Sequence, residues 1–178
     1  MIINMNKYNI DQVHSTIGFS VKHLIVSKVK GFFGKFEGSL STDDENFTNA
    51  KINFSADVAS INTNNAMRDG HLHTDDFFNA AEFPQITFVS NSFVKKDDSN
   101  FTVVGDFTMK GITKEITLNA AFQGFIPGEA GKKIAAFEVI GVINRLDYGV
   151  SWNSPLENGG VAVSNDVMLD AVLQLKQE

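Results

Sequence analysis

The sequence contains no cysteine, one tryptophan, two tyrosines and three prolines among its 178 residues. Without cysteine the protein has no disulfide framework, no thiolate nucleophile and no thiolate ligand for a metal. Its apolar runs are also short. None approaches the ~20 residues of a membrane-spanning helix, so we expect no stable membrane insertion. Because residues 1–12 lack the apolar core of a secretory signal, we expect a cytoplasmic protein if Met1 is the natural start, and a periplasmic one if a signal peptide has been removed.

Basic residues are few as well. Fifteen Lys and Arg stand against 21 Asp and Glu, which gives a formal net charge of −6 at pH 7. The basic residues are scattered along the chain, and this argues against nucleic acid and against anionic membrane surfaces as partners.

The motifs of common catalytic sites are missing too. There is no Gly-x-Ser-x-Gly sequence and no Gly-rich phosphate loop. His14 and Ser15 are neighbours, but adjacent side chains on a strand point to opposite faces, so they would not form a pair of base and nucleophile. We therefore predict no catalytic residues and no cofactor, and a binding protein rather than an enzyme.

Phenylalanine is the residue in excess, with 16 copies, and 43% of the chain is hydrophobic. This length and hydrophobic content suit a single domain over residues 1–178. A Phe-rich interior forms where strands surround a wide space. That space is either a cavity for a long apolar ligand or a core filled by the rings themselves, and composition favours neither.

Apolar and polar residues alternate along much of the chain. Ile17, Phe19 and Val21 share one parity, and the period of two recurs over residues 52–58, 101–109, 116–124 and 167–175. This pattern is typical of antiparallel strands with one buried face. In residues 29–40 the parity changes, and a bulge near Gly34 would restore a single apolar face. About eight strands are expected, the number that can enclose one small ligand in a barrel, although a sandwich also fits the spacing.

Residues 68–90 interrupt this alternation. They contain two histidines, three aspartates, an Arg-Asp pair and two adjacent phenylalanines. We interpret residues 64–83 as a short helical or looped lid over a cavity mouth, ended by Pro84. His71 and His73 stand two apart but have no third ligand nearby, so no metal site is predicted. We expect these histidines to hold the segment in place by hydrogen bonds.

Five stretches of the chain form a recognisable series. They are IDQVHSTIGFSVKHL (10–24), VKGFFGKFEGSL (29–40), RDGHLHTDDFFNAAEFPQITFVS (68–90), FTMKGITKEITL (107–118) and INRLDYGVSWN (143–153). In this order they resemble the YceI-like family of lipocalin-like, polyisoprenoid-binding barrels, over nearly the whole chain. The resemblance implies an all-β, antiparallel lipocalin-like barrel that binds a polyisoprenoid or a similar long-chain amphiphilic lipid. The lipid would be of the isoprenoid quinone, polyprenyl phosphate or fatty-acid-like type, and the protein a carrier, storage or sensor protein. The family includes dimers, which implies a homodimer.

The candidate site residues form two groups. Alternation and the lid interpretation assign the wall of a lipid-binding cavity to Phe19, Val21, Phe33, Phe36, Phe54, Val58, Phe77, Phe78, Phe88, Phe107 and Phe122. The polar candidates for the rim or for a lipid headgroup are His23, Arg68, His71 and Arg145. For Arg68-Asp69 and Arg145-Asp147 we favour a structural role over a headgroup contact, although arginine suits both.

Two alternatives remain open from the sequence. One is an enzyme acting on a lipophilic substrate in the same cavity. It would need a titratable group deep inside, and His23 is the clearest candidate. The other is a stress-related barrel whose core is filled by its own side chains.

Overall fold

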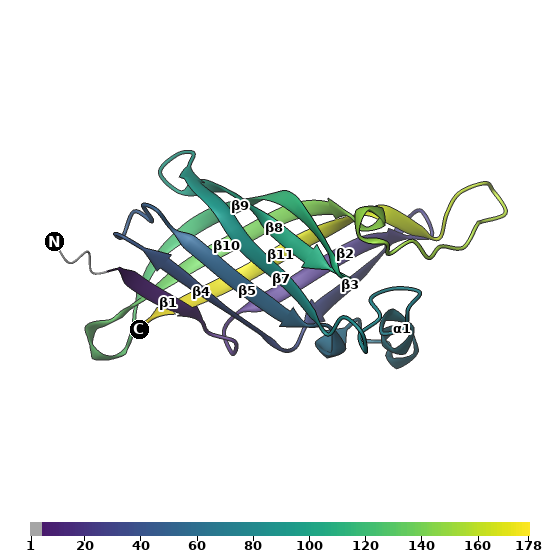
Figure 1. Cartoon of the computed structure of the whole chain (residues 1–178), viewed down its shortest axis with the longest axis horizontal. Coiled ribbons are helices and arrows are strands. Elements are labelled where there is room, and N and C mark those ends of the chain that lie inside the picture. Colours follow the sequence, from purple (N-terminus) through teal and green to yellow (C-terminus); the bar gives the residue numbers. More distant parts are fainter. Residues whose placement is uncertain (1–4) are drawn as a thin grey trace.

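The computed structural model describes residues 5–178 and consists mostly of strands (Figure 1). The strands are β1 (Asn6–Ile10), β2 (Thr16–His23), β3 (Ser27–Phe33), β4 (Phe36–Thr42), β5 (Lys51–Asp57), β6 (Ile61–Asn62), β7 (Gln85–Lys95), β8 (Asn100–Met109), β9 (Ile112–Pro127), β10 (Lys133–Asn144) and β11 (Val163–Gln177). The helical elements are α1 (Ala66–Leu72) and three 3-10 turns, η1 (Val58–Ser60), η2 (Glu129–Gly131) and η3 (Arg145–Tyr148). No helix within residues 5–178 is long and apolar enough to cross a membrane.

The strands close into an eight-stranded antiparallel barrel. Their order is β1-β4-β5-β7-β8-β9-β10-β11, and β11 pairs with β1 through Tyr8 and Gln177. Three of the eight barrel strands each consist of two consecutive elements. They are β1 with β2, β3 with β4, and β5 with β6. The expected all-β barrel of eight strands is confirmed, and the sandwich alternative is excluded.

Each of the three composite strands is interrupted near its middle. The β3–β4 interruption consists of Gly34 and Lys35, and its neighbour is η1 on the β5–β6 strand. The amide of Gly34 donates to the carbonyl of Ser60 (3.0 Å), and the amide of Asp57 donates to the carbonyl of Lys35 (2.9 Å). Gly34 and Lys35 shift the alternation of inward and outward side chains, so that Phe33 before them and Phe36 after them are both buried. The expected irregularity near Gly34 is therefore a short break between two strands rather than a bulge within one.

The interruption between β1 and β2, residues 11–15, is held by an ion-pair cluster. The carboxylate of Asp11 accepts from Nζ of Lys176 on β11 (2.8 Å) and contacts Nδ1 of His14 (2.7 Å). These contacts, with Lys176 the stronger, hold the pKa of Asp11 well below its usual range. The Asp11 carboxylate thereby fixes the bend of β1 against the last strand.

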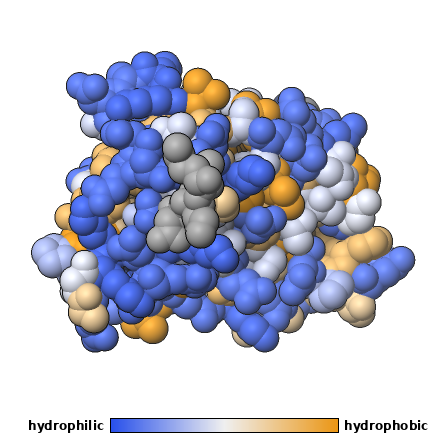
Figure 2. All heavy atoms as spheres, turned by 60° about the vertical axis from the view of Figure 1, so that its left-hand side comes forward, coloured by the Kyte–Doolittle hydropathy of each residue, from blue (hydrophilic) through white to orange (hydrophobic). Residues whose placement is uncertain are grey.

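The barrel end where β1 begins and β11 ends is plugged by aromatic rings. Phe47, from the loop between β4 and β5, is only 2% exposed. Five rings from β7–β10 surround it at centroid distances of 5.0 to 6.3 Å: Phe93, Phe101, Phe122, Phe125 and Phe137. Edge-to-face and stacked pairs of this kind are the preferred aromatic arrangements. This Phe47 cluster closes one end of the barrel, and Figure 2 shows that the outer surface around this end is mostly hydrophilic.

The opposite end carries the lid segment, residues 64–83, in which α1 confirms the expected helix. The helix begins where the side chain of Asn65 accepts from the amide of Arg68 (3.0 Å), a side-chain cap that satisfies a free helical donor. Residues after α1 continue in turns up to Pro84, and β7 begins immediately afterwards. The lid segment is thus a short helix and turns between two strand ends.

Candidate functional site

The barrel encloses a cavity of about 530 Å³, within the range of ~300–1,000 Å³ that is usual for small-molecule sites. Its wall is built from the inward-facing residues of most of the strands and is overwhelmingly aliphatic and aromatic. Phe93 and Phe137 line the cavity and also pack on Phe47, so the Phe47 cluster forms its floor. The cavity is therefore closed at one end and reached from the end that carries the lid segment.

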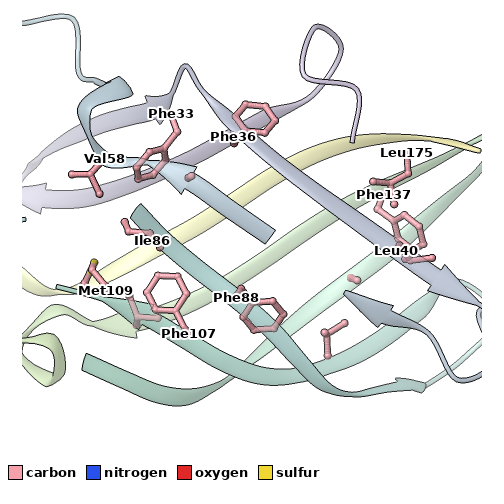
Figure 3. Packing of buried hydrophobic residues seen from close by; sticks show 14 of the residues in the cluster. Phe33, Phe36, Leu40, Val58, Ile86, Phe88, Phe107, Met109, Phe137 and Leu175 are labelled. Carbon is pink, nitrogen blue, oxygen red and sulfur yellow. The ribbon is translucent and has the colours of Figure 1, made fainter. Parts of the chain in front are cut away.

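Eight of the eleven residues predicted for the cavity wall do line it: Phe19, Val21, Phe33, Phe54, Phe77, Phe78, Phe88 and Phe107. Phe88 on β7 and Phe107 on β8 are directly paired across the two strands, and Figure 3 shows both rings inside the barrel. Phe19 lies over Gly31, where a side chain on the neighbouring strand would collide with the ring. A glycine opposite the ring leaves it room to lie against the barrel wall.

The other three predicted wall residues lie outside the cavity, and here the sequence prediction needs correction. Phe36 follows directly after the Gly34–Lys35 break and packs on Phe54 (6.5 Å between centroids). Val58 is buried in η1, where its amide donates to the carbonyl of Pro84 (2.9 Å). Phe122 belongs to the Phe47 cluster (5.0 Å). All three are in the interior, but alternation indicates only which face a side chain occupies and not its height along the barrel axis.

The four polar residues predicted for the rim all line the cavity. Arg68 of α1 donates from Nε to the hydroxyl of Thr63 (2.8 Å) and from Nη2 to the carbonyl of Thr63 (2.8 Å). Asp69 accepts from the amide of Thr63 (2.9 Å). Arg68 and Asp69 thus tie α1 to the residue after β6, as a structural role requires. The Nη1 group of Arg68 makes no hydrogen bond to any residue from 5 to 178.

Arg145 is the second guanidinium group at this end, and it is only 4% exposed. It donates to four backbone carbonyls, at distances of 2.7 to 3.3 Å, on Val150, Trp152, Val163 and Ser164. Asp147, on the same turn, is exposed and forms no ion pair with it. Burial lowers the pKa of Arg145, yet a guanidinium stays protonated in proteins. The fold therefore places a buried positive charge beside the cavity without a carboxylate within ion-pair distance in the described chain.

An aromatic cluster holds the lid segment over the mouth. The ring of His71 meets Phe77 and Trp152 edge to face, both at 5.0 Å, and Phe77 and Trp152 are 5.3 Å apart. Nε2 of His71 contacts the carboxylate of Asp76 (2.7 Å). Sequence reasoning missed Trp152, although the only tryptophan of the chain lies within the last of the recognisable stretches. Being the only tryptophan, in a stretch that resembles the family, was the signal that could have identified Trp152.

Lys110 also attaches the lid segment to the barrel, and His73 lies at the end of its helix. Nζ of Lys110, from the turn between β8 and β9, donates to the carbonyl of Asp75 (2.7 Å) and to that of Gly149 (3.3 Å). His73 is the C-terminal cap of α1, and its Nε2 is buried without a hydrogen-bond partner in the described part of the chain. Among residues 5–178 no three side chains of metal-ligating type gather at one point. The predicted hydrogen bond is thus present for His71 and missing at Nε2 of His73.

His23 lies at the end of β2, paired with Ser27 and Val163, and faces the cavity near its mouth. The deep part of the wall consists of residues such as Leu118, Val139 and Leu173. The titratable group that the enzyme alternative requires deep in the cavity is therefore not provided by His23.

A closed eight-stranded barrel with an overwhelmingly apolar cavity wall, a plugged floor and two arginines at the mouth has the architecture of a protein that encloses an apolar ligand. A family model described as the YceI-like domain matches residues 8–175, and the chain belongs to this family.

Three known proteins illustrate the similarity. The chain is 41% identical to UPF0312 protein SAS2572 of Staphylococcus aureus (strain MSSA476), over 94% of this chain and 95% of that protein. The crystal structure of the YceI protein of Campylobacter jejuni is 32% identical, with a TM-score of 0.76 over 94% of this chain and 96% of that one. A polyisoprenoid-binding domain from Saccharophagus degradans shares the fold, at 17% identity and a TM-score of 0.64 over 96% and 98% of the two chains.

Proposed function

We propose that this protein binds a polyisoprenoid or a similar long-chain amphiphilic lipid as a carrier, storage or sensor protein, with no bond made or broken. The observation that carries the proposal is the separation of chemistry along the barrel axis. The cavity wall is apolar down to Phe93 and Phe137, whereas Arg68, Arg145 and His71 stand at the mouth. An amphiphile with an apolar tail and one polar end matches this distribution.

The apolar tail supplies the affinity. Burying one methylene contributes about 0.8 kcal/mol, so a five-carbon isoprene unit contributes roughly 4 kcal/mol. The loss of translational and rotational freedom on binding costs about 4–15 kcal/mol. A tail of a few isoprene units therefore suffices for tight binding without any specific polar contact. Because the Phe47 cluster closes the far end, we infer that the tail enters past the lid segment and ends on that floor.

The headgroup is proposed to lie at the two arginines. Arg145 donates its N–H groups to backbone carbonyls and supplies charge, while the Nη1 group of Arg68 has no hydrogen-bond partner among residues 5–178. Guanidinium groups bind phosphate in a bidentate manner and donate equally to a carbonyl oxygen. A polyprenyl phosphate or an isoprenoid quinone satisfies this arrangement, and the uncompensated positive charge favours the phosphate.

Native mass spectrometry of the gently purified protein tests the proposal. We expect one lipid per chain, or uptake of one farnesyl phosphate by the lipid-free protein. Arg68→Gln should weaken binding of farnesyl phosphate by about tenfold and leave farnesol binding nearly unchanged, because a charge-assisted hydrogen bond contributes about 1.5–3 kcal/mol. A protein that carries no lipid and takes up neither compound would support the filled barrel instead. A homodimer is part of the proposal through the resemblance, and light scattering measures it.

A further inference from the structure

The turn between β2 and β3 exposes three consecutive apolar side chains. Leu24, Ile25 and Val26 are 49%, 62% and 86% exposed. Leu24 and Ile25 also have positive φ angles of 51° and 73°, in the left-handed region that Gly and Asn adopt most readily. A β-branched residue in this region is strained. These three residues, the hairpin tip, are thus exposed, two of them with an unfavourable backbone conformation, and nothing in the fold of residues 5–178 accounts for their apolar character.

The same hairpin is locally basic in an acidic protein. Lys22, Lys28 and Lys30 are exposed, and Lys22 is directly opposite Lys28 across the two strands. Like charges in this position repel each other. No acidic residue occurs in residues 12–36, and none of the three lysines is in an ion pair within the described chain. Asp166, in the bulge of β11 beside β2, forms no ion pair with any of them.

The hairpin tip adjoins the mouth of the cavity. Val21 and Val29, next to the tip on β2 and β3, line the cavity wall. The amide of Leu24 donates to the carbonyl of Ala162 (2.9 Å), which brings the half-exposed Val161 beside the tip. Met67 of α1 lines the cavity although it is 87% exposed. In Figure 1 the β2–β3 turn, α1 and the loop before β11 all lie at the same end of the barrel.

We propose that the hairpin tip docks the cavity mouth on an anionic lipid bilayer. Leu24, Ile25 and Val26 enter the interfacial region, and the three lysines contact lipid phosphates. Peripheral membrane binding needs two such signals, because a short apolar insertion alone is weak and reversible. A protein partner would need about 800 Å² of contact surface, which a three-residue tip between like charges does not offer. The even spread of basic residues along the whole chain argues against anionic membranes, but the β2–β3 hairpin is a local exception.

Flotation with vesicles tests this docking. We expect binding to vesicles of phosphatidylcholine and phosphatidylglycerol in equal parts, weakening with added salt, and none to phosphatidylcholine alone. Replacing Lys22, Lys28 and Lys30 together by Gln should lower the affinity by about fivefold per lysine. The double variant Leu24→Asn, Ile25→Gly should lower it by about tenfold or more and should not lower the melting temperature, because Asn-Gly suits both positive φ angles.

Matched variants elsewhere provide the controls. Val13→Asn removes an apolar side chain that is 85% exposed, more than Leu24 or Ile25, and Lys95, Lys96 and Lys132 changed to Gln remove three exposed lysines at the plugged end. Both should bind vesicles like the wild type. The proposal is overturned if the wild type does not float, if the Asn-Gly variant floats equally well, or if the controls lose as much. Light scattering that shows a dimer lost in the Asn-Gly variant would also overturn it, since the tip would then bind a second copy. The vesicles contain no polyisoprenoid, so failure here leaves the cavity proposal to its own test.

Discussion

A cavity-filling substitution distinguishes a hollow barrel from a filled one by the sign of its effect. Val139 on β10 is paired with Ala120 on β9 and with Ala171 on β11, and all three line the cavity. The small alanine side chains on both sides leave space for a ring at position 139. We predict that Val139→Phe stabilises the lipid-free protein and blocks lipid uptake.

The expected magnitudes differ enough to measure. In a hollow barrel the larger side chain buries on the order of 40 Å² more apolar surface, which contributes about 1 kcal/mol. In a filled core the same change overpacks and costs about 1–3 kcal/mol. For a protein of this size, 1 kcal/mol shifts the melting temperature by roughly 2–4 °C. We therefore expect a rise of about 2–4 °C if the cavity is empty, against a fall of about 2–12 °C if it is filled.

The assay is thermal unfolding of delipidated protein, followed by circular dichroism, beside the uptake of a fluorescent polyprenyl probe. Val58→Phe is the matched control, because Val58 is 2% exposed but lies outside the cavity, so the same change should destabilise there. A fall in the melting temperature of Val139→Phe comparable to that of the control would refute the reasoning. Unchanged probe uptake by a stable Val139→Phe would show that the lipid binds elsewhere.

Four further predictions concern the lid, pH, metal and the chain start. Changing Phe77 and Phe78 together to Ala should speed lipid release and leave the far-ultraviolet circular dichroism of the barrel unchanged; an unchanged release rate would mean that the segment is not a gate. The folded-state pKa of Asp11 lies below its unfolded value of about 3.9, so the ionised carboxylate stabilises the fold at neutral pH, and this contribution is lost as the pH falls below about 4. Urea unfolding at pH 6 and pH 3 should accordingly show a smaller pH dependence for Asp11→Asn than for the wild type. Chelation of divalent metals should leave the melting temperature unchanged, and a stoichiometric metal lost on His71→Ala would contradict this. For localisation, cell fractionation with N-terminal sequencing distinguishes the two expectations, a chain that starts at Met1 in the cytoplasmic fraction or a processed chain in a periplasmic extract.

The alternation of residues predicted the strands and their inward faces well, because the period of two is set locally by the backbone. It could not predict height along the barrel, which depends on register between strands. Phe107 and Phe122 show the difference. Both face inward from neighbouring strands, yet one lines the cavity and the other closes its floor. The change of parity at Gly34 was readable, whereas its form as a break beside η1 depends on a partner strand far along the sequence.

The burial of Phe47 and the hydrogen-bond partners of Arg145 could not be predicted from the sequence for a different reason. Phe47 stands alone in a polar loop and has a positive φ of 62°, so no periodic pattern marks it as buried. Its burial results from rings on four other strands that meet only when the barrel closes. The structural role favoured for Arg145 agrees with its contacts, but its partners are backbone carbonyls that no sequence pattern marks, and Asp147 is left exposed on η3. Neighbouring charges in a sequence thus predict an ion pair only where the local backbone brings them together.

The excess of phenylalanine has one physical explanation that covers both readings of the composition. Rings fill the barrel around Phe47, where Phe122 and Phe137 approach it to 5.0 Å and leave no room for a ligand. Nearer the mouth, Phe88 and Phe107 lie along the wall and the centre of the barrel stays open. An eight-stranded barrel has an interior just wide enough either to be filled by side chains or to hold one small ligand. The position of each ring along the axis, rather than the number of rings, therefore decides where the barrel is core and where it can bind.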